Sequence, residues 1–105
     1  MLERDFQRKL IKELKGLFKG CIVMKMDAGY KQGIPDLLIL YLHKWAALEV
    51  KKSAKASLRP NQRHYISKMN AMSFARIIYP ENKKEVLNEL IRFFKTKAGV
   101  EARVA

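Results

Sequence analysis

Two acidic residues and a lysine lie at the ends of two short apolar segments. Asp36 directly precedes the segment 37–42, and Glu49 and Lys51 stand at the end of the segment 45–50. Both segments are too short to span a membrane, and they are typical of strands buried on both faces. We therefore read them as the two strands of a β-hairpin that carries carboxylates and an ammonium group at one end.

The pairing of this hairpin decides whether those groups meet. We expect the turn at His43-Lys44, although neither is the Gly or Asn that tight hairpin turns prefer. The resulting pairs are Leu42 with Trp45, Leu38 with Glu49 and Asp36 with Lys51. Because side chains alternate between the faces of a strand, Asp36, Glu49 and Lys51 then share one face. A one-residue slip of the register would separate them.

This combination suits phosphodiester hydrolysis. Two carboxylates about 7–8 Å apart on a diagonal can hold one divalent cation, Mg²⁺ or Mn²⁺. Such a cation lowers the pKa of bound water, and Lys51 can orient or deprotonate the water and stabilise negative charge. Alternatively, Asp36 and Glu49 are solvated residues at strand ends. Glu49 argues against this, because it interrupts an apolar strand where an unpaired charge is costly.

The same residues resemble a known nuclease signature. Asp36 together with Glu49-Val50-Lys51 resembles the PD-(D/E)XK motif. More narrowly, the chain resembles the VRR-NUC family at Glu3-x-x-x-Gln7, Gly33-Ile34-Pro35-Asp36-Leu37, Glu49-Val50-Lys51 and Gln62. The resemblance extends from about Glu3 to Phe94. It implies a PD-(D/E)XK nuclease-like αβββαβ core, a small mixed sheet flanked by helices, and a C-terminal helix.

The resemblance also implies roles for individual residues. It makes Asp36, Glu49, the backbone carbonyl of Val50 and the first-helix acid Glu3 the metal ligands. It places Gln62 beside the active lysine, so the implied catalytic residues are Asp36, Glu49, Lys51 and Gln62. Glu3 could instead only stabilise the helix start, and Asp5 could take its place. Gln62 could be merely solvated, since Arg59 stands where the family usually has a small capping residue.

Composition points to a polyanionic partner. The 105 residues include 22 Lys and Arg against 10 Asp and Glu, a formal charge of +12, and such a basic domain is expected to bind nucleic acid. Six basic residues flank the acidic site and are candidates for phosphate contacts, although each alone could be an ordinary surface charge. They are Lys25, Lys31, Lys52, Lys55, Arg59 and Arg63. Tyr30 could stack on a base or simply pack.

The length predicts a single domain over residues 1–105. Helices are predicted over 3–18, 60–72 and 83–96, and strands over 21–26, 37–42, 45–50 and 74–79; we expect residues 97–105 to fray. The N-terminus does not resemble a signal peptide, and no run of about 20 apolar residues exists. Cys21, the single cysteine, excludes an internal disulfide and fits a reducing cytoplasm. The small size is compatible with a phage or mobile-element origin.

The sequence therefore predicts a metal-dependent DNA endonuclease, structure-specific rather than sequence-specific because it lacks an extra recognition domain. By resemblance, it would act on Holliday junctions or other branched DNA as a homodimer in repair or recombination, without an organic cofactor or a membrane. Phe93, Phe94 and Val100 are expected to be exposed and are candidates for the dimer interface. The main alternative is a basic nucleic-acid-binding protein on a nuclease-like fold that does not cut. A third is an RNA-directed nuclease or a repair subunit that needs a partner chain.

Overall fold

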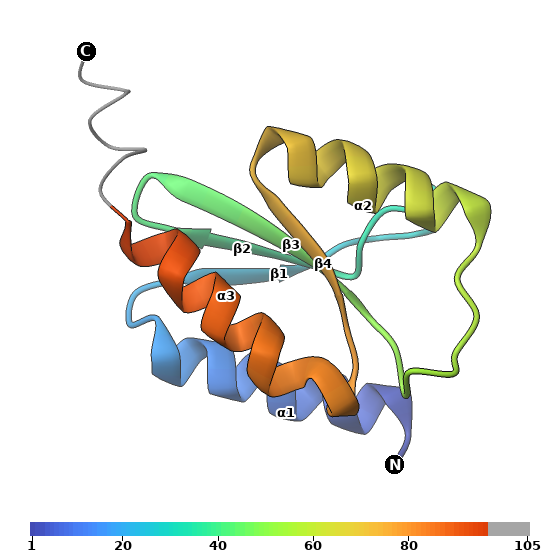
Figure 1. Cartoon of the computed structure of the whole chain (residues 1–105), viewed down its shortest axis with the longest axis horizontal. Coiled ribbons are helices and arrows are strands. Elements are labelled where there is room, and N and C mark those ends of the chain that lie inside the picture. Colours follow the sequence, from blue (N-terminus) through green and yellow to red (C-terminus); the bar gives the residue numbers. More distant parts are fainter. Residues whose placement is uncertain (97–105) are drawn as a thin grey trace.

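A computed structural model describes residues 1–96 of the chain. Three α-helices and four β-strands alternate in the order helix, three strands, helix, strand, helix (Figure 1). The elements are α1 (Glu3–Leu17), β1 (Ile22–Lys25), β2 (Leu37–Tyr41), β3 (Lys44–Val50), α2 (Pro60–Met72), β4 (Phe74–Ile78), a 3₁₀ turn (Pro80–Asn82) and α3 (Lys83–Lys95). The predicted bounds of α2 are confirmed, those of α1, β2, β3, β4 and α3 differ by one residue at one end, and β1 is one residue shorter than predicted at each end.

The strands form one mixed sheet in the order β1-β2-β3-β4. β1 pairs with β2 and β2 with β3 in antiparallel fashion, whereas β3 and β4 run parallel across the connection that contains α2. In Figure 1, α1 and α3 lie on one side of the sheet and α2 lies on the other. The prediction of an α/β sandwich on a small mixed sheet is confirmed at this level.

α1 forms because its apolar residues recur at helical spacing. Phe6, Leu10 and Leu14 are buried, and Phe18 continues their line just beyond the helix end. The first turn carries acidic side chains and the last turn a lysine, both favourable to the helix dipole. The chain leaves the helix through Gly20, whose φ of +87° is readily adopted only by glycine.

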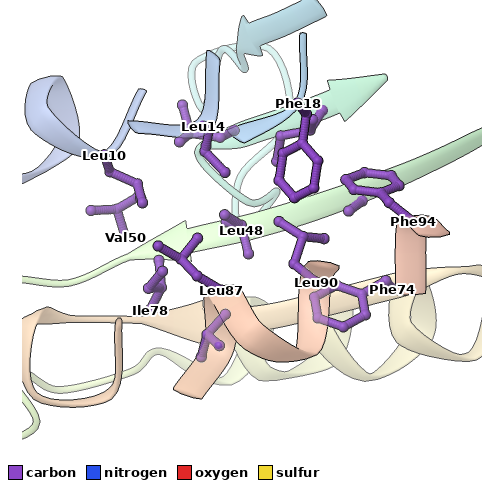
Figure 2. Packing of buried hydrophobic residues seen from close by; sticks show 14 of the residues in the cluster. Leu10, Leu14, Phe18, Leu48, Val50, Phe74, Ile78, Leu87, Leu90 and Phe94 are labelled. Carbon is purple, nitrogen blue, oxygen red and sulfur yellow. The ribbon is translucent and has the colours of Figure 1, made fainter. Parts of the chain in front are cut away.

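The main core lies between α1, α3 and the sheet. Leu48 and Val50 of β3 point into it, where they meet α1 residues such as Leu14 and α3 residues such as Leu90 (Figure 2). At one end Phe18, Tyr41 and Phe94 form an aromatic cluster with ring centroids 5.0–5.4 Å apart. Alternation along β3 sends Trp45, Ala47 and Glu49 to the opposite face, beneath α2.

The hairpin turn is one residue earlier than predicted. Tyr41 pairs with Lys44, so the turn consists of Leu42 and His43. Leu40, not Leu42, lies opposite Trp45, and Leu38 lies opposite Ala47 instead of Glu49. The predicted register is therefore wrong by two positions. Because two is the period of a strand, every side chain nevertheless keeps its predicted face.

The α2 face is only partly covered. α2 packs on β4 and β3 and contains no fully buried residue. Beyond its reach, Ile22 and Met24 of β1 are 56% and 44% exposed, while Leu38 and Leu40 of β2 are half-buried. The prediction that both hairpin strands are buried on both faces is therefore wrong for β2, because one short helix cannot cover four strands.

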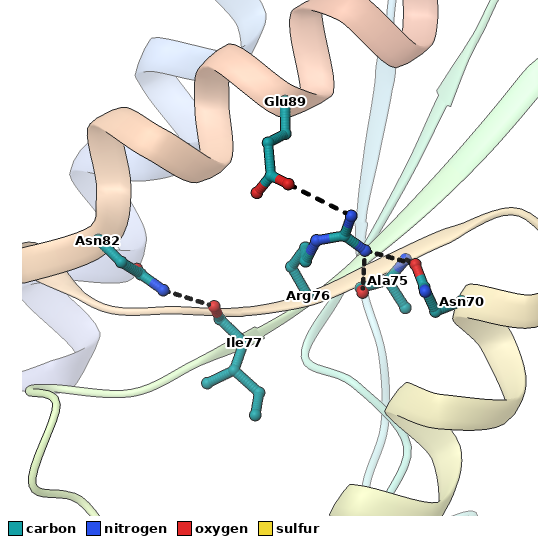
Figure 3. A network of polar contacts seen from close by, with 6 residues as sticks. All are labelled: Asn70, Ala75, Arg76, Ile77, Asn82 and Glu89. Carbon is teal, nitrogen blue, oxygen red and sulfur yellow. Dashed lines mark hydrogen bonds and ion pairs between the residues drawn. The ribbon is translucent and has the colours of Figure 1, made fainter.

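The outer edge of β4 is protected by side chains. Asn70 Oδ1 accepts the Ala75 N–H at 3.1 Å, and Asn82 Nδ2 donates to the Ile77 carbonyl at 3.0 Å. Arg76 bonds to Asn70 and pairs with Glu89 of α3 at 3.4 Å (Figure 3). Backbone groups that another strand could have paired with are thus occupied.

The proposed interface residues lie elsewhere than expected. Phe94 is only 1% exposed, and Phe93 packs against the core, because α3 turns this side towards the sheet. The prediction that both are exposed is wrong. Val100 falls outside the described residues. Among residues 1–96, no helix has the length and apolar character needed to cross a membrane.

Candidate functional site

The two predicted acids stand opposite each other at the end of the β2–β3 ladder. The last pair of that ladder is Leu37 with Leu48, so the next positions outward are Asp36 and Glu49. The Asp36 carbonyl accepts the Met26 N–H at 2.8 Å, which extends the β1–β2 pairing by one residue. Its side chain is fixed as well, because Asp36 Oδ2 accepts the Val50 N–H at 2.8 Å.

Glu49 is the one buried charged residue among those described, with 3% of its surface exposed. Lys51 Nζ lies 3.4 Å from its Oε2, and the lysine side chain is itself largely covered. Burying a carboxylate is costly unless it is paired and hydrogen-bonded. The cost is offset here by the Lys51 ammonium, which lies close to the Glu49 carboxylate.

Gln62 links the acid to the lysine. It lies in the first turn of α2, where its Nε2 donates to Glu49 Oε2 at 3.1 Å. Its Oε1 accepts from Lys51 Nζ at 3.2 Å and from the Arg59 N–H at 2.9 Å. Because both of these partners only donate, the amide can adopt only this orientation.

The unusual residue before Pro60 does not misdirect Gln62. Arg59 occupies the N-cap with extended backbone. The Gln62 amide oxygen accepts its N–H, which is the second half of a capping box. The same bond that starts α2 therefore aims Gln62 at the acidic pair.

The surroundings of both carboxyl groups disfavour their charged forms. Burial, followed by the negative charge of Asp36, raises the pKa of Glu49 to about 7, against the opposing effect of Lys51. Burial also raises the pKa of Asp36, although the bond from Val50 N–H partly opposes this shift. Two like charges that cannot both ionise freely would be relieved by a cation.

These residues fit a divalent metal ion in one respect and fall short in another. Asp36 and Glu49 offer hard oxygen donors in close proximity, which is what Mg²⁺ and Mn²⁺ prefer. Glu3 is near enough for its charge to raise the pKa of Glu49. However, no group of three or more His, Cys, Asp or Glu side chains in the range 1–96 could hold a metal ion together. The fit is therefore to a two-carboxylate site in which water supplies further ligands, as Mg²⁺ commonly accepts.

The predicted phosphate-binding residues are all at the surface. Lys25, Lys31, Lys52, Lys55, Arg59 and Arg63 are exposed. Lys25 ends β1 opposite Leu37, and Lys31 lies 5.6 Å from the Tyr65 ring. Tyr30 is 89% exposed, so it is not a packing residue. His43 lies in the hairpin turn, at the end of the ladder opposite the acids.

A cavity of about 290 Å³ adjoins the site. The loop between β1 and β2 forms one wall and the first turn of α2 forms the other, and Asp36 and Gln62 both line it. Sequence reasoning missed two of its polar residues, Gln32 and Asn61. The signal that could have identified them is their place in the sequence, since each directly precedes a residue of the VRR-NUC resemblance, Gly33 or Gln62.

Comparisons with protein-family models, with curated proteins and with solved structures each found no match for this chain.

Proposed function

We propose that the chain is a divalent-metal-dependent endonuclease that hydrolyses phosphodiester bonds in DNA, with a PD-(D/E)XK nuclease-like core of the VRR-NUC type. The observation that supports it best is the buried Glu49, opposite Asp36 and bonded to both Lys51 and Gln62. A lysine and two acids in one partly buried cluster, on a chain of charge +12, match the needs of phosphate chemistry.

Each residue of the cluster has a task in this proposal. Asp36 and Glu49 would hold Mg²⁺ or Mn²⁺, with the Val50 carbonyl and water as further ligands. Glu3, which forms no three-acid group with them in the range 1–96, would contribute only its negative charge. The ion would polarise the phosphoryl oxygen and lower the pKa of a water molecule. Lys51 places a positive charge beside the phosphoryl group, where negative charge develops. Gln62 holds the Lys51 ammonium at 3.2 Å, which keeps it from swinging into solvent. The exposed basic residues bind the backbone without reading sequence.

Branched DNA is the proposed substrate, with Holliday junctions as one form. Cutting two symmetric strands of a junction requires two sites related by a two-fold axis, so we also propose a homodimer. Sedimentation at micromolar concentration tests this, and a monomer under cutting conditions would remove the support for junction resolution.

The test of the proposed function compares a labelled four-way junction with a matched duplex, in Mg²⁺ or Mn²⁺. Asp36→Asn and Lys51→Ala should abolish cleavage by the folded protein. Glu89→Gln is the matched control, because that carboxylate pairs with Arg76 on the other side of the sheet. Cleavage that survives Asp36→Asn would refute the proposed site.

A second candidate is a basic nucleic-acid-binding protein that does not cut. The absence of a third acidic, His or Cys ligand in the cluster within residues 1–96 favours it. Metal titration separates the two: a nuclease should bind Mn²⁺ and lose that binding in Asp36→Ala. A protein that binds DNA tightly but binds no Mn²⁺ would be the non-cutting alternative.

A further inference from the structure

The cavity beside the acidic pair has walls that belong to two different segments. Gly29, Gln32 and Gly33 come from the β1–β2 loop, and Arg59 and Asn61 come from the start of α2. We call it the loop–helix pocket. Since Asp36 and Gln62 also line it, anything bound there lies directly beside the proposed reaction centre.

Close backbone packing holds the two walls together. Gly33 has a φ of +88°, and a Cβ added to it would lie only 2.8 Å from the Asn61 backbone. No side chain fits between the loop and the helix at this point. The loop is also tied by Lys31, whose ammonium lies over the Tyr65 ring of α2.

The loop is ordered within itself as well. Asp27 Oδ1 accepts the Gly29 N–H at 2.8 Å, and the Asp27 carbonyl accepts the Tyr30 N–H at 3.1 Å. These bonds form a turn that needs no ligand. The pocket is therefore preformed, which reduces the entropic cost of binding.

The chemistry of the lining suits a neutral, hydrogen-bonding ligand. Gln32, Asn61 and Gln62 contribute amides, which both donate and accept. The ionisable side chains of the lining are Arg59 and Asp36, one of each sign. Among residues 1–96, no lysine lines the pocket, although the chain has 22 Lys and Arg residues. A phosphate would find a single cationic side chain, Arg59, in this lining, whereas the edge of a nucleobase offers the mixed donors and acceptors that amides pair with.

We propose that the loop–helix pocket binds the unpaired base of the nucleotide next to the phosphate that is cut. This inference rests on the proposed nuclease function and specifies its substrate. A base inside a duplex is stacked and paired, so it would have to unstack and lose its partner before entering the pocket. A base already unpaired at a branch enters without that cost. The pocket thus selects branched or frayed DNA without reading its sequence through the duplex grooves.

The experiment first maps the cut in a branched DNA. The nucleotide on either side of the cut is then replaced, one at a time, by an abasic residue that keeps both phosphates. At one of the two positions, loss of the base should lower kcat/KM by about five-fold or more, which is the lower end of the effect of one lost bidentate base contact. Equal rates with and without the base at both positions would overturn the inference, and would mean that the pocket contacts a phosphate instead of a base.

Variants of the pocket sharpen the result. Asn61→Ala should lower the rate on the intact DNA and leave little further effect of base removal, because the contact is then already lost. Gln32→Ala provides the same test from an exposed loop position, where folding is least affected. Asn88→Ala is the matched control, an exposed asparagine of α3 that should retain the full difference between the two substrates.

A binding measurement keeps this inference separate from the proposed function. The fluorescent base 2-aminopurine at the branch, in metal-free buffer, should change its emission when the protein binds, and Asn61→Ala should remove the change. If no DNA is cut in any metal but this signal is present, the pocket is supported and the nuclease is not. If DNA is cut and no signal appears, the nuclease is supported and the pocket inference is wrong.

Discussion

The two faces of the sheet are built on opposite principles. On the α1/α3 face, apolar side chains such as Phe18, Leu48 and Leu90 are completely buried. On the α2 face, the helix buries none of its residues fully, and the most deeply buried group with a charge is Glu49. One face supplies stability, and the other accepts a loss of stability to hold polar groups in place.

This contrast explains how so small a protein could hold a buried acid. A chain of 105 residues has a stability of only about 5–15 kcal/mol. A single complete core between α1, α3 and the sheet leaves the second face free for hydrogen-bonded polar groups. α2 then positions Gln62 more than it fills space.

The difference between the two faces of the sheet is tested most strongly by one alanine substitution on each face. Phe18→Ala should lower the free energy of unfolding by about 3–5 kcal/mol, because the ring is fully buried and packs on Tyr41 and Phe94. Ile66→Ala in α2, which is half-buried, should cost no more than about 1–2 kcal/mol. Urea unfolding measures both. Similar losses at the two sites would show that the faces are energetically alike.

The second test uses pH on the metal-free protein. Glu49 has a pKa raised from its ordinary 4.5 to about 7, so between those values the folded state holds more protons than the unfolded state. Stability should therefore fall as pH rises from about 4.5 to 7, by roughly 3 kcal/mol for a shift of this size. Denaturation in EDTA at a series of pH values measures the slope.

A matched variant identifies the source of that slope. Glu49→Gln removes the titrating group and should flatten the curve, whereas Glu89→Gln should leave it unchanged. Millimolar Mn²⁺ should restore stability at pH 8 in the natural protein and in Glu89→Gln but not in Glu49→Gln, because the cation relieves the repulsion between Asp36 and Glu49. A pH-independent stability would mean that Lys51 already neutralises the pair.

A third and smaller effect is expected at Gln62. Gln62→Ala removes a donor to Glu49 and an acceptor for the Arg59 N–H, so it should cost about 1–2 kcal/mol. Gln7→Ala, a half-buried glutamine of α1, should cost less than half as much. Thermal unfolding at fixed pH compares them, and equal shifts would mean that the Gln62 bonds add nothing net.

Local patterns predicted most of the fold. The helical spacing of Phe6, Leu10 and Leu14 located α1, and Pro60 marked the start of α2 at its observed position. The partial cover of the α2 face could not be predicted, because the strands that a helix covers depend on tertiary packing. Ile22 and Met24 look like core residues in the sequence and are exposed in the fold.

The sequence was sufficient to predict that the acidic residues and the lysine of the candidate site share one face. It was not sufficient to predict the hydrogen bonds that hold them. The strand period alone puts Asp36, Glu49 and Lys51 on one face, and it does so even with the register wrong by two positions. The bond from Val50 N–H to Asp36 and the fixed orientation of Gln62 depend on distances across three elements. No sequence spacing contains that information.

The smallest change in stability is expected in the hairpin turn, which lies away from both the core and the acidic site. Leu42 has a φ of +58°, a left-handed conformation that is strained for a residue of its size, and it is largely exposed there. A two-residue hairpin turn of this kind favours glycine at its first position. The absence of that glycine is why the turn was placed one residue too late. Leu42→Gly should therefore stabilise the protein by about 1 kcal/mol, with no change in the pH slope that Glu49 controls.

His43→Gly is the matched control, since His43 is not among the described residues with positive φ. It should destabilise the protein slightly through the added freedom of the unfolded chain. Urea midpoints that rise for Leu42→Gly and fall for His43→Gly would show that the strain lies in one residue of the turn, distant from both the core and the site. A fall for both would mean that Leu42 contributes packing at the open edge of the α2 face that outweighs its strain.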